Sequence, residues 1–324
     1  MSEPAKLIAA RDIKEIAKLA VLAVNSWFIP ETNWGRISGA VAALISRLEP
    51  TRTRSRIECI RLGLGHRQIA TPVRDVEVRF LAALYEQRLQ LIREYRPGGW
   101  RPVIRLTGRE NIEAALARGH GAVLWISEFV FSSLVTKIAL HQAGFSVSHL
   151  SRPEHGPSPT RFGRRFLNPT VIHIENRYLG ERVVIGPEGA GRAMKELGQR
   201  LRFNGIVSIL AMVDAQARTQ ARNSIQVPFL NGSISLSTGP ANFALKAGAP
   251  LLPVFAIRTA AGEFEVDIGR PLDVEGQPDG KSPRVTALQQ YAGMLKAYVL
   301  RFPHLWPNWG YLKVDSGDQE SGIQ

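Results

Sequence analysis

The sequence contains a single cysteine, and this scarcity excludes several kinds of protein. Cys59 has no second cysteine to pair with, so an intramolecular disulfide cannot form. A metal cluster built on cysteine ligands is excluded for the same reason. Chains without disulfides are typical of reducing compartments. We therefore expect the folded part of the chain to lie in such a compartment, with Cys59 as an ordinary core thiol.

The sequence also lacks an apolar run long enough to span a membrane. The most apolar stretch near its start, residues 19–29, is interrupted by Asn25 and Ser26 and is shorter than the roughly 20 residues that a spanning helix needs. Lysines precede this stretch and no small-residue cleavage site follows it, so we expect no signal peptide. The pattern of residues 13–29 predicts an interfacial helix that lies on a membrane, with a buried helix as the alternative.

Acidic residues are few compared with basic ones. The chain has 28 Asp and Glu against 41 Lys and Arg, which gives a formal net charge of +13 and favours an anionic partner or surface. Zinc-finger spacing, a basic region with heptads and an aromatic RNA-binding signature are all missing, so we expect no nucleic acid as a partner. The arginine-rich run at residues 47–61 is typical of either a basic patch facing an anionic membrane or a solvated helix face.

The rest of the chain alternates strand-like and helix-like segments. Residues 122–126 form a short apolar run, typical of a strand buried on both faces. A helix capped by Ser132 or Ser133 is expected next, and Gly144 ends it. Residues 147–150 return as a strand, which a right-handed crossover makes parallel to the first. We therefore predict an α/β fold with a mixed, mostly parallel central sheet flanked by helices, preceded by membrane-proximal N-terminal helices.

Other segments extend this pattern along the chain. Further strands are predicted at residues 103–107, 171–174, 206–213, 224–230, 251–258 and 263–268, the last as an antiparallel partner. Further helices are predicted at residues 34–48, 74–95, 111–118, 191–203, 237–247 and 283–302. We expect a helical membrane-associating region at 1–98, an α/β domain at 99–314 and a disordered tail at 315–324.

The functional site is expected at one edge of the predicted sheet. The loop at residues 127–133 follows the first central strand, and the loop at 151–159 follows the second. Because these strands are expected to run parallel, both loops should open at the same edge, which is where α/β folds bind ligands.

Several local strings follow one another in an informative order. They are a glycine before the apolar strand (121–126), RP (152–153), DAQ (214–216), NSIQVPF (223–229), STGPANFALKAGAPLLPVF (237–255) and PHLWPNWGY (303–311). In this order and spacing, behind membrane-proximal helices, they resemble the bacterial lipid A biosynthesis lauroyl and myristoyl acyltransferases, part of the lysophospholipid acyltransferase-like group. The resemblance covers nearly the whole chain.

The resemblance implies that a fatty acyl group moves from an acyl-carrier-protein or coenzyme A thioester to a hydroxyl of a lipid or glycolipid acceptor. It implies a peripheral or monotopic protein at the cytoplasmic face of the bacterial inner membrane. It implies no metal and no cofactor beyond the thioester co-substrate. The family signature is a histidine, four residues and a carboxylate, in which the histidine takes the acceptor's proton and the carboxylate holds the imidazole.

This sequence departs from that signature. Alignment of the strand ends puts Glu128 where the histidine belongs and Ser133 where the carboxylate belongs. A glutamate has a pKa of about 4.3, so Glu128 is a poor base unless burial raises its pKa. Glu128 is thus either a replacement base or a structural or substrate-positioning carboxylate. Ser133 is either a nucleophile or a helix cap. His155, in the second loop, is either a relocated base held by a carboxylate or a solvated histidine.

The remaining candidates concern substrate binding. Arg152 matches a family arginine expected to contact an anionic substrate or the phosphate of the acyl carrier. Arg164 is expected to assist it, with Arg161 and Arg165, because guanidinium pairs bidentately with phosphate. Asp214 and Gln216 are expected to shape the acceptor pocket, or to brace their loop.

Three functions remain open from the sequence. The first is an acyltransferase with an altered catalytic dyad. The second is a catalytically inactive homologue that binds lipid, acyl carrier or a partner enzyme. The third is an unrelated basic binding module. Two further histidines, His149 and His173, are expected within strands as core or edge residues.

Overall fold

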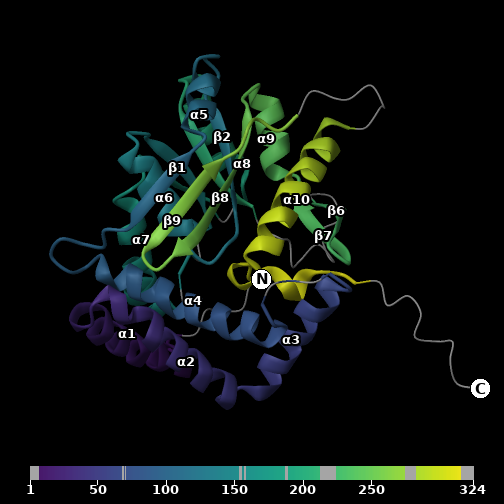
Figure 1. Ribbon diagram of the computed structural model, residues 1–324. Helices are drawn as coiled ribbons and strands as arrows, with labels where there is room; N and C mark the ends of the chain where they lie inside the picture. Colours follow the sequence, from purple (N-terminus) through teal and green to yellow (C-terminus); the bar gives the residue numbers. More distant parts are fainter. Residues whose placement is uncertain are drawn as a thin grey trace, which may run out of the picture.

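The computed structural model describes residues 7–67, 69, 71–152, 155–156, 158–186, 189–211, 224–273 and 282–314 (Figure 1). The α-helices in this part are α1 (Ala10–Phe28), α2 (Trp34–Leu48), α3 (Pro50–Leu64), α4 (Val73–Arg93), α5 (Arg109–Leu116), α6 (Ser132–Gln142), α7 (Asn168–Asn176), α8 (Gly191–Arg202), α9 (Gly239–Ala247) and α10 (Pro283–Arg301). Shorter helical turns are η1 (Glu31–Asn33), the π-helical turn η2 (Gly163–Leu167), η4 (Pro303–Leu305) and η5 (Asn308–Tyr311). The strands are β1 (Val103–Thr107), β2 (Ala122–Ser127), β3 (Val147–Ser151), β4 (Glu181–Val184), β5 (Ile206–Ala211), β6 (Ser224–Phe229), β7 (Gly232–Ser237), β8 (Leu251–Ala260) and β9 (Glu263–Ile268).

Seven strands form the central sheet in the order β1-β9-β8-β2-β5-β3-β4. Every pairing in this sheet is parallel except β8 with β9, so the predicted mixed, mostly parallel sheet is confirmed. The strands β2 and β3 run in the same direction, as the crossover rule requires, and β5 lies between them. The carboxyl ends of β2, β5, β3 and β4 therefore lie along one edge of the sheet.

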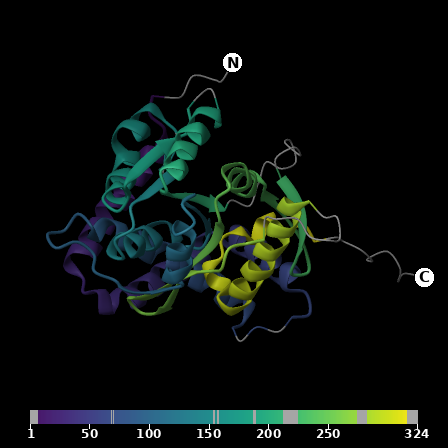
Figure 2. The same cartoon turned by 90° about the horizontal axis from the view of Figure 1, so that it is seen from above.

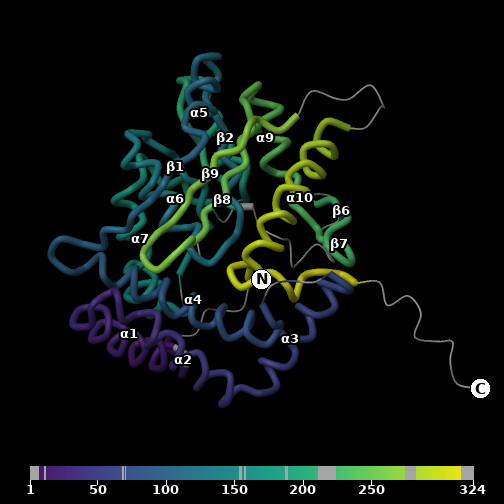
Figure 3. Tube along the Cα trace, viewed as in Figure 1, coloured from purple at the N-terminus to yellow at the C-terminus, as the bar shows by residue number. Residues whose placement is uncertain are grey.

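The N-terminal helices gather at this carboxyl edge. Figures 1 and 3 show α1 to α4 (purple to blue) together at one end of the sheet, where α4 packs against α1, α2 and α3. The side-chain amide of Gln87 in α4 donates a hydrogen bond to the carbonyl oxygen of Val130, just beyond β2. In Figure 2, the teal segment around residues 150–200 and the yellow helix α10 lie on opposite sides of the molecule. One buried apolar core joins residues of the N-terminal helices to residues of the sheet.

Aromatic stacking attaches α10 to the sheet. The ring of Tyr291 stacks on Trp125 of β2 with 4.0 Å between centroids, and Tyr298 stacks on Phe255 of β8 at 4.2 Å. The Tyr298 hydroxyl also donates to Asp267 Oδ2 at 2.6 Å. Because these rings are large and the Trp125, Phe255 and Tyr291 rings are buried, the stacking fixes the position of α10 on the sheet.

Helix α1 turns its polar side inward and its apolar side outward. Asp12 is fully buried and accepts hydrogen bonds from Ser158 Oγ at 2.6 Å and Thr160 Oγ1 at 2.9 Å. Ser26, also buried, donates to the Leu89 carbonyl at 3.0 Å. The opposite side exposes a stripe of large apolar residues: Ile13, Ile16, Val21, Val24, Trp27 and Phe28. None of the helices in the described ranges is both long and apolar enough to cross a membrane.

The structure corrects one predicted strand. Residues 171–174 lie in helix α7, not in a strand, so His173 is a helix residue. The β-branched run VIHI favoured a strand, but Pro169 in the first helical turn supplies a fixed φ that starts a helix. His149 does lie in a strand, β3, as predicted. The strand predicted at residues 224–230 pairs with β7 in a separate two-stranded sheet.

The capping prediction for α6 is also wrong. The cap position is Phe131, and neither serine caps the helix. Ser132 Oγ accepts a hydrogen bond from the Phe129 N–H at 3.1 Å, while Ser133 points to another helix, as described below.

Helix α3 carries most of the arginine-rich run, and several of its charges are already paired. Arg52 and Arg61 each pair with a glutamate three residues away on the chain. Arg56 is half-buried, pairs with Glu77 at 2.9 Å and lies over the Phe80 ring. These contacts favour a structural role for part of the run. In Figure 3 the C-terminal trace returns to this helix, where Arg56 Nη2 donates to the Pro307 carbonyl at 3.2 Å.

Gly121, directly before β2, offers a direct test of backbone fit. Both Gly119 and Gly121 have positive φ, but a Cβ at Gly121 would collide with the Gly205 carbonyl oxygen, whereas a Cβ at Gly119 would meet open space. Gly119→Ala should cost about 1–2 kcal/mol in the free energy of unfolding, from φ strain alone. Gly121→Ala should cost clearly more than its control in urea unfolding. Equal costs would show that this close approach does not constrain the strand.

Candidate functional site

The loop after β2 carries Glu128 at the carboxyl edge of the sheet. Glu128 Oε2 accepts a hydrogen bond from Asn308 Nδ2 at 2.9 Å. Burial raises the pKa of Glu128, although the Asn308 bond and the charge of Arg152 act in the opposite direction. The same loop is held by the Val130 N–H, which donates to the Leu305 carbonyl at 2.9 Å. Glu128 is thus a fixed carboxylate, positioned by the C-terminal segment.

Ser133, on the first turn of α6, contacts a carboxylate that comes from a different helix. Its hydroxyl donates to Glu175 Oε1 at 2.6 Å. Glu175 lies at the end of α7 and is almost completely buried. The alignment of strand ends put Ser133 where the family resemblance implies an acid. Ser133 is in direct contact with a carboxylate, but Glu175 supplies it.

Three nitrogen-bearing side chains meet the other oxygen of Glu175. Lys137 Nζ lies at 3.0 Å, Arg182 Nη2 at 2.6 Å and His155 Nε2 at 3.0 Å from Glu175 Oε2. Lys137 also donates to Ser133 Oγ at 2.9 Å. We call these five residues, Ser133, Lys137, His155, Glu175 and Arg182, the Glu175 cluster. The His155 side chain is 31% exposed, whereas those of Lys137 and Glu175 are 2–3% exposed.

The electrostatics of the cluster follow from burial and charge pairing. Burial alone would raise the pKa of Glu175, but Lys137 and the hydrogen bonds from His155 and Ser133 together hold it well below its ordinary value. Burial lowers the pKa of Lys137, while Glu175 opposes this. Glu175 therefore remains an anion in the folded protein, which is the condition for holding an imidazole by charge as well as by hydrogen bonding.

His155 is the member of the cluster suited to proton transfer. Its Nε2 is held by Glu175, and among the described residues its Nδ1 makes no hydrogen bond. A histidine oriented at one ring nitrogen by a carboxylate can accept a proton at the other. From the sequence, His155 was either a relocated base held by a carboxylate or a solvated histidine. In the structure, the carboxylate beside its ring is Glu175, which is supplied by α7.

The other predicted site residues fall outside this contact set. Arg152 is exposed at the end of β3, and its charge acts on Glu128. Arg164 is exposed and donates through Nε to the Pro159 carbonyl at 3.0 Å. Arg161 and Arg165 are exposed near it. Asp214 and Gln216 lie outside the described residues.

Sequence reasoning missed Lys137, Glu175, Arg182 and Asn308. Glu175 was hidden because residues 171–174 were interpreted as a strand. Lys137 lies four residues after Ser133 on α6, so helical spacing alone indicated that the two side chains are neighbours. Arg182 and Asn308 are long-range partners that carried no local signal.

His149 lies beside the cluster and makes the stability of the fold depend on pH. Its Nδ1 contacts Ser208 Oγ at 2.8 Å, and burial, together with the charge of Lys137, lowers its pKa well below the ordinary value of 6.5. The folded state keeps His149 neutral, while the unfolded state binds a proton below about pH 6.5. Stability from this residue is therefore present above pH 6.5 and is lost as the pH falls. Glu175 adds a second loss below its ordinary pKa of 4.5.

We accordingly expect the free energy of unfolding to fall by about 1.4 kcal/mol per pH unit below pH 6.5 on account of His149. Urea unfolding between pH 7 and 5 measures this slope. His149→Asn should make the slope shallower, whereas His141→Asn, at an exposed position on α6, should leave it unchanged. An unchanged slope in His149→Asn would contradict the assignment.

Comparison with known proteins identifies the family of this chain. The family model described as bacterial lipid A biosynthesis acyltransferase matches residues 85–290, which run from α4 through the first turns of α10 and include the whole Glu175 cluster. No curated protein matches the chain. The family is one of acyltransferases that are membrane-associated in general. Because the match covers more than half of its length, the chain belongs to the bacterial lipid A biosynthesis acyltransferase family.

Proposed function

We propose that this protein transfers a fatty acyl group from an acyl-carrier-protein or coenzyme A thioester to a hydroxyl of a lipid or glycolipid, with His155 as the general base. The family supports acyl transfer in general terms. One observation carries the assignment of the base: His155 Nε2 lies 3.0 Å from the buried Glu175 carboxylate, at the sheet edge where α/β folds bind ligands.

The reaction follows from these contacts. His155 Nδ1 takes the proton of the acceptor hydroxyl as that oxygen attacks the thioester carbonyl carbon. Glu175 keeps the ring oriented and stabilises the imidazolium that forms. When the tetrahedral intermediate collapses, the carbon–sulfur bond breaks and the thiolate leaves. The proton on His155 then passes to that thiolate, so the base returns to its starting state.

Glu128 and Arg152 have supporting roles in this proposal. Asn308 holds Glu128, and its carboxylate faces the charge of Arg152. This placement suits a group that positions substrate more than one that removes a proton, because a base must be able to reach the acceptor. The exposed Arg152 is expected to contact the phosphate of the acyl donor or acceptor.

A second candidate function is an inactive homologue that binds lipid, acyl carrier or a partner enzyme. The number of ion pairs at Glu175 favours this inactive homologue, because Lys137 and Arg182, two buried cations, contact the same carboxylate as His155. A cluster of this kind can serve stability alone. The two functions differ in whether an acylated product is formed, and the amount of this product can be measured.

Lipid analysis of a deletion strain separates these possibilities. The strain would be complemented with wild type, His155→Gln, Glu128→Gln or the control His141→Gln, each at matched protein level. Loss of a positioned base costs on the order of 10²- to 10⁴-fold in rate. His155→Gln should therefore fail to restore the acylated lipid, while Glu128→Gln should restore part of it and His141→Gln all of it. Failure of Glu128→Gln together with full activity of His155→Gln would make Glu128 the base. Wild-type function without any acylated product would favour the binder.

We also propose that α1 holds the protein on the cytoplasmic face of the bacterial inner membrane as a peripheral or monotopic protein. The exposed apolar stripe of α1 supports this, because such a face buries itself favourably at the lipid interface. The exposed arginines of η2, Arg164 and Arg165, follow the Ser158–Thr160 turn that is bonded to Asp12 and suit anionic head groups. This arrangement would bring the loop that carries His155 close to the lipid acceptor.

Vesicle binding tests this attachment. Val24→Glu combined with Phe28→Glu should lower co-sedimentation with anionic vesicles at least tenfold, because two apolar side chains are lost and two negative charges are gained. Phe203→Glu is the matched control, since Phe203 is 84% exposed but lies at the end of α8. Equal binding of the double variant and the control would reject α1 as the membrane contact.

A further inference from the structure

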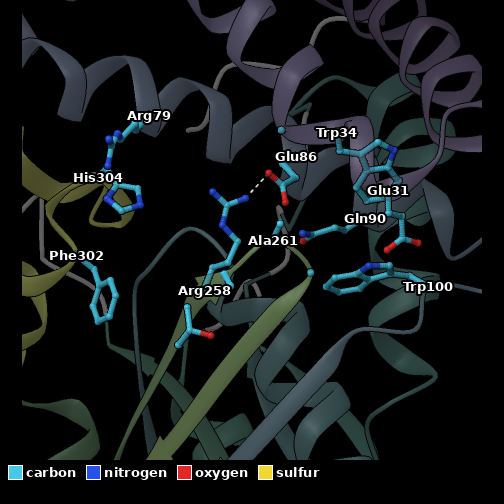
Figure 4. A pocket seen from close by; sticks show the side chains of 14 residues that line it. Glu31, Trp34, Arg79, Glu86, Gln90, Trp100, Arg258, Ala261, Phe302 and His304 are labelled. Atoms are coloured by element: carbon cyan, nitrogen blue, oxygen red, sulfur yellow. Dashed lines mark hydrogen bonds and ion pairs between the residues drawn. The ribbon is translucent and has the colours of Figure 1, made fainter.

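A cavity of about 320 Å³ lies at the carboxyl end of β8, where α4 and the start of α2 approach the β8–β9 turn. Figure 4 shows the labelled side chains around it. Its volume is at the lower end of the range of about 300–1,000 Å³ that small-molecule sites occupy. Neither the family signature nor the Glu175 cluster contributes a residue to its lining.

One end of the cavity is basic. Arg79, Arg258 and His304 line it together. Arg258 forms an ion pair with Glu86, which Figure 4 marks with a dashed line. Arg79 makes no ion pair or hydrogen bond within the described residues. Burial and the charges of both arginines lower the pKa of His304 to about 4, so its ring adds no charge at neutral pH. At this end the Glu86 carboxylate is therefore paired with Arg258, while Arg79 has no ion-pair partner in the described part of the chain.

The other end holds two tryptophan rings and the carboxylate of Glu31, which lies 3.7 Å from Arg93 Nε. Trp34 and Trp100 are almost completely buried and present their rings to the cavity, with the Gln90 amide beside them. The ring of Phe302 lines the cavity next to His304. This wall offers apolar and stacking surface to the body of a ligand whose anionic group lies between the arginines.

The cavity is connected to the loop that carries Glu128. The guanidinium of Arg258 lies 5.3 Å from the ring centroid of Phe131, three residues after Glu128. His304 precedes Leu305, whose carbonyl accepts the Val130 N–H. A ligand held by Arg258 and His304 would therefore contact β8 and η4, and both of these elements hold the β2–α6 loop in place.

From these observations we infer that the cavity is a second anion site, which binds a phosphate monoester between Arg79 and Arg258 with the rest of the ligand against the aromatic wall. The guanidinium of Arg79, which is exposed and has no ion-pair partner among the described residues, fits this ligand class, and so does the partly open cavity through which a ligand can enter. A phosphate has enough acceptor oxygens to take hydrogen bonds from two guanidinium groups at once. The phosphate could belong to a lipid headgroup or to a soluble ester.

Binding of soluble probes to the full-length protein tests the inference without any need for turnover. The probes are inorganic phosphate and glycerol 3-phosphate, followed by calorimetry and by the imidazole NMR signal of His304, assigned with His304→Asn. Arg79→Gln should weaken glycerol 3-phosphate binding about tenfold, the effect of one lost charge-assisted contact of about 1.4 kcal/mol. Arg74→Gln, at an exposed position on the same helix but outside the cavity lining, should bind as wild type. Ala261→Asp, which adds a carboxylate at the exposed turn lining the cavity, should abolish binding while leaving the fold intact.

A lipid arm distinguishes the source of the phosphate. Vesicles that contain phosphatidic acid would be compared with phosphatidylcholine vesicles, using Arg79→Gln and Arg74→Gln. If Arg79→Gln loses binding to phosphatidic acid vesicles alone, the ligand is a lipid headgroup. If Arg79→Gln loses binding to the soluble esters, the ligand is a free phosphate ester. If neither the soluble probes nor the vesicles bind in an Arg79-dependent way and the His304 signal does not move, the cavity is a packing space and the inference is wrong. This outcome leaves the proposed acyl transfer untouched.

Discussion

The arrangement of the candidate site depends on the charge of one buried carboxylate. Glu175 contacts two cations, Lys137 and Arg182, whose side chains are almost as buried as its own. Buried charges lose several kcal/mol of hydration each and are tolerated only when paired and hydrogen-bonded. Removal of one partner from such a set typically costs about 3–5 kcal/mol. Since the partners come from α6, β4 and the loop after β3, the carboxylate fixes those three elements relative to α7.

This constraint also bears on the motif that the family resemblance led us to expect. That resemblance implies a histidine at the strand end and an acid five positions later, and the alignment of strand ends puts Glu128 and Ser133 at those positions. Ser133 Oγ lies 2.6 Å from Glu175, so an aspartate at residue 133 would place two carboxylates in contact. Like charges at such a distance cannot both remain ionised without a large pKa shift. An acid at residue 133 and Glu175 would therefore repel each other. The histidine that contacts Glu175 comes from the loop after β3.

Much of the fold was predictable because its strands are short, apolar and bounded by glycines. Residues 122–126 are buried along their whole length, and their uniform apolar composition shows it. Helix α7 was not predicted, because the β-branched residues 171–174 favour a strand. Pro169 in the first turn favours a helix, and this preference prevailed. Of the candidate site, the sequence indicated His155 as one alternative because of its loop. Glu175 pairs with Ser133 across 42 residues, a separation at which no local pattern exists. The orientation of helix α1 also carried no local signal. Its polar residues form hydrogen bonds to the rest of the protein, and its apolar side is therefore exposed.

In the proposed reaction, the reacting centre lies at His155 and not at Glu128. The most direct measurement is a crystal structure of the protein with a non-hydrolysable acyl-coenzyme A thioether, in which the carbon next to sulfur marks the thioester carbonyl. The account predicts that this carbon lies within about 3–5 Å of His155 Nδ1, close enough for an acceptor oxygen between them, while the Glu175 contact stays intact. Placement of that carbon against the Glu128 carboxylate, with His155 outside reach of the ligand, would contradict it.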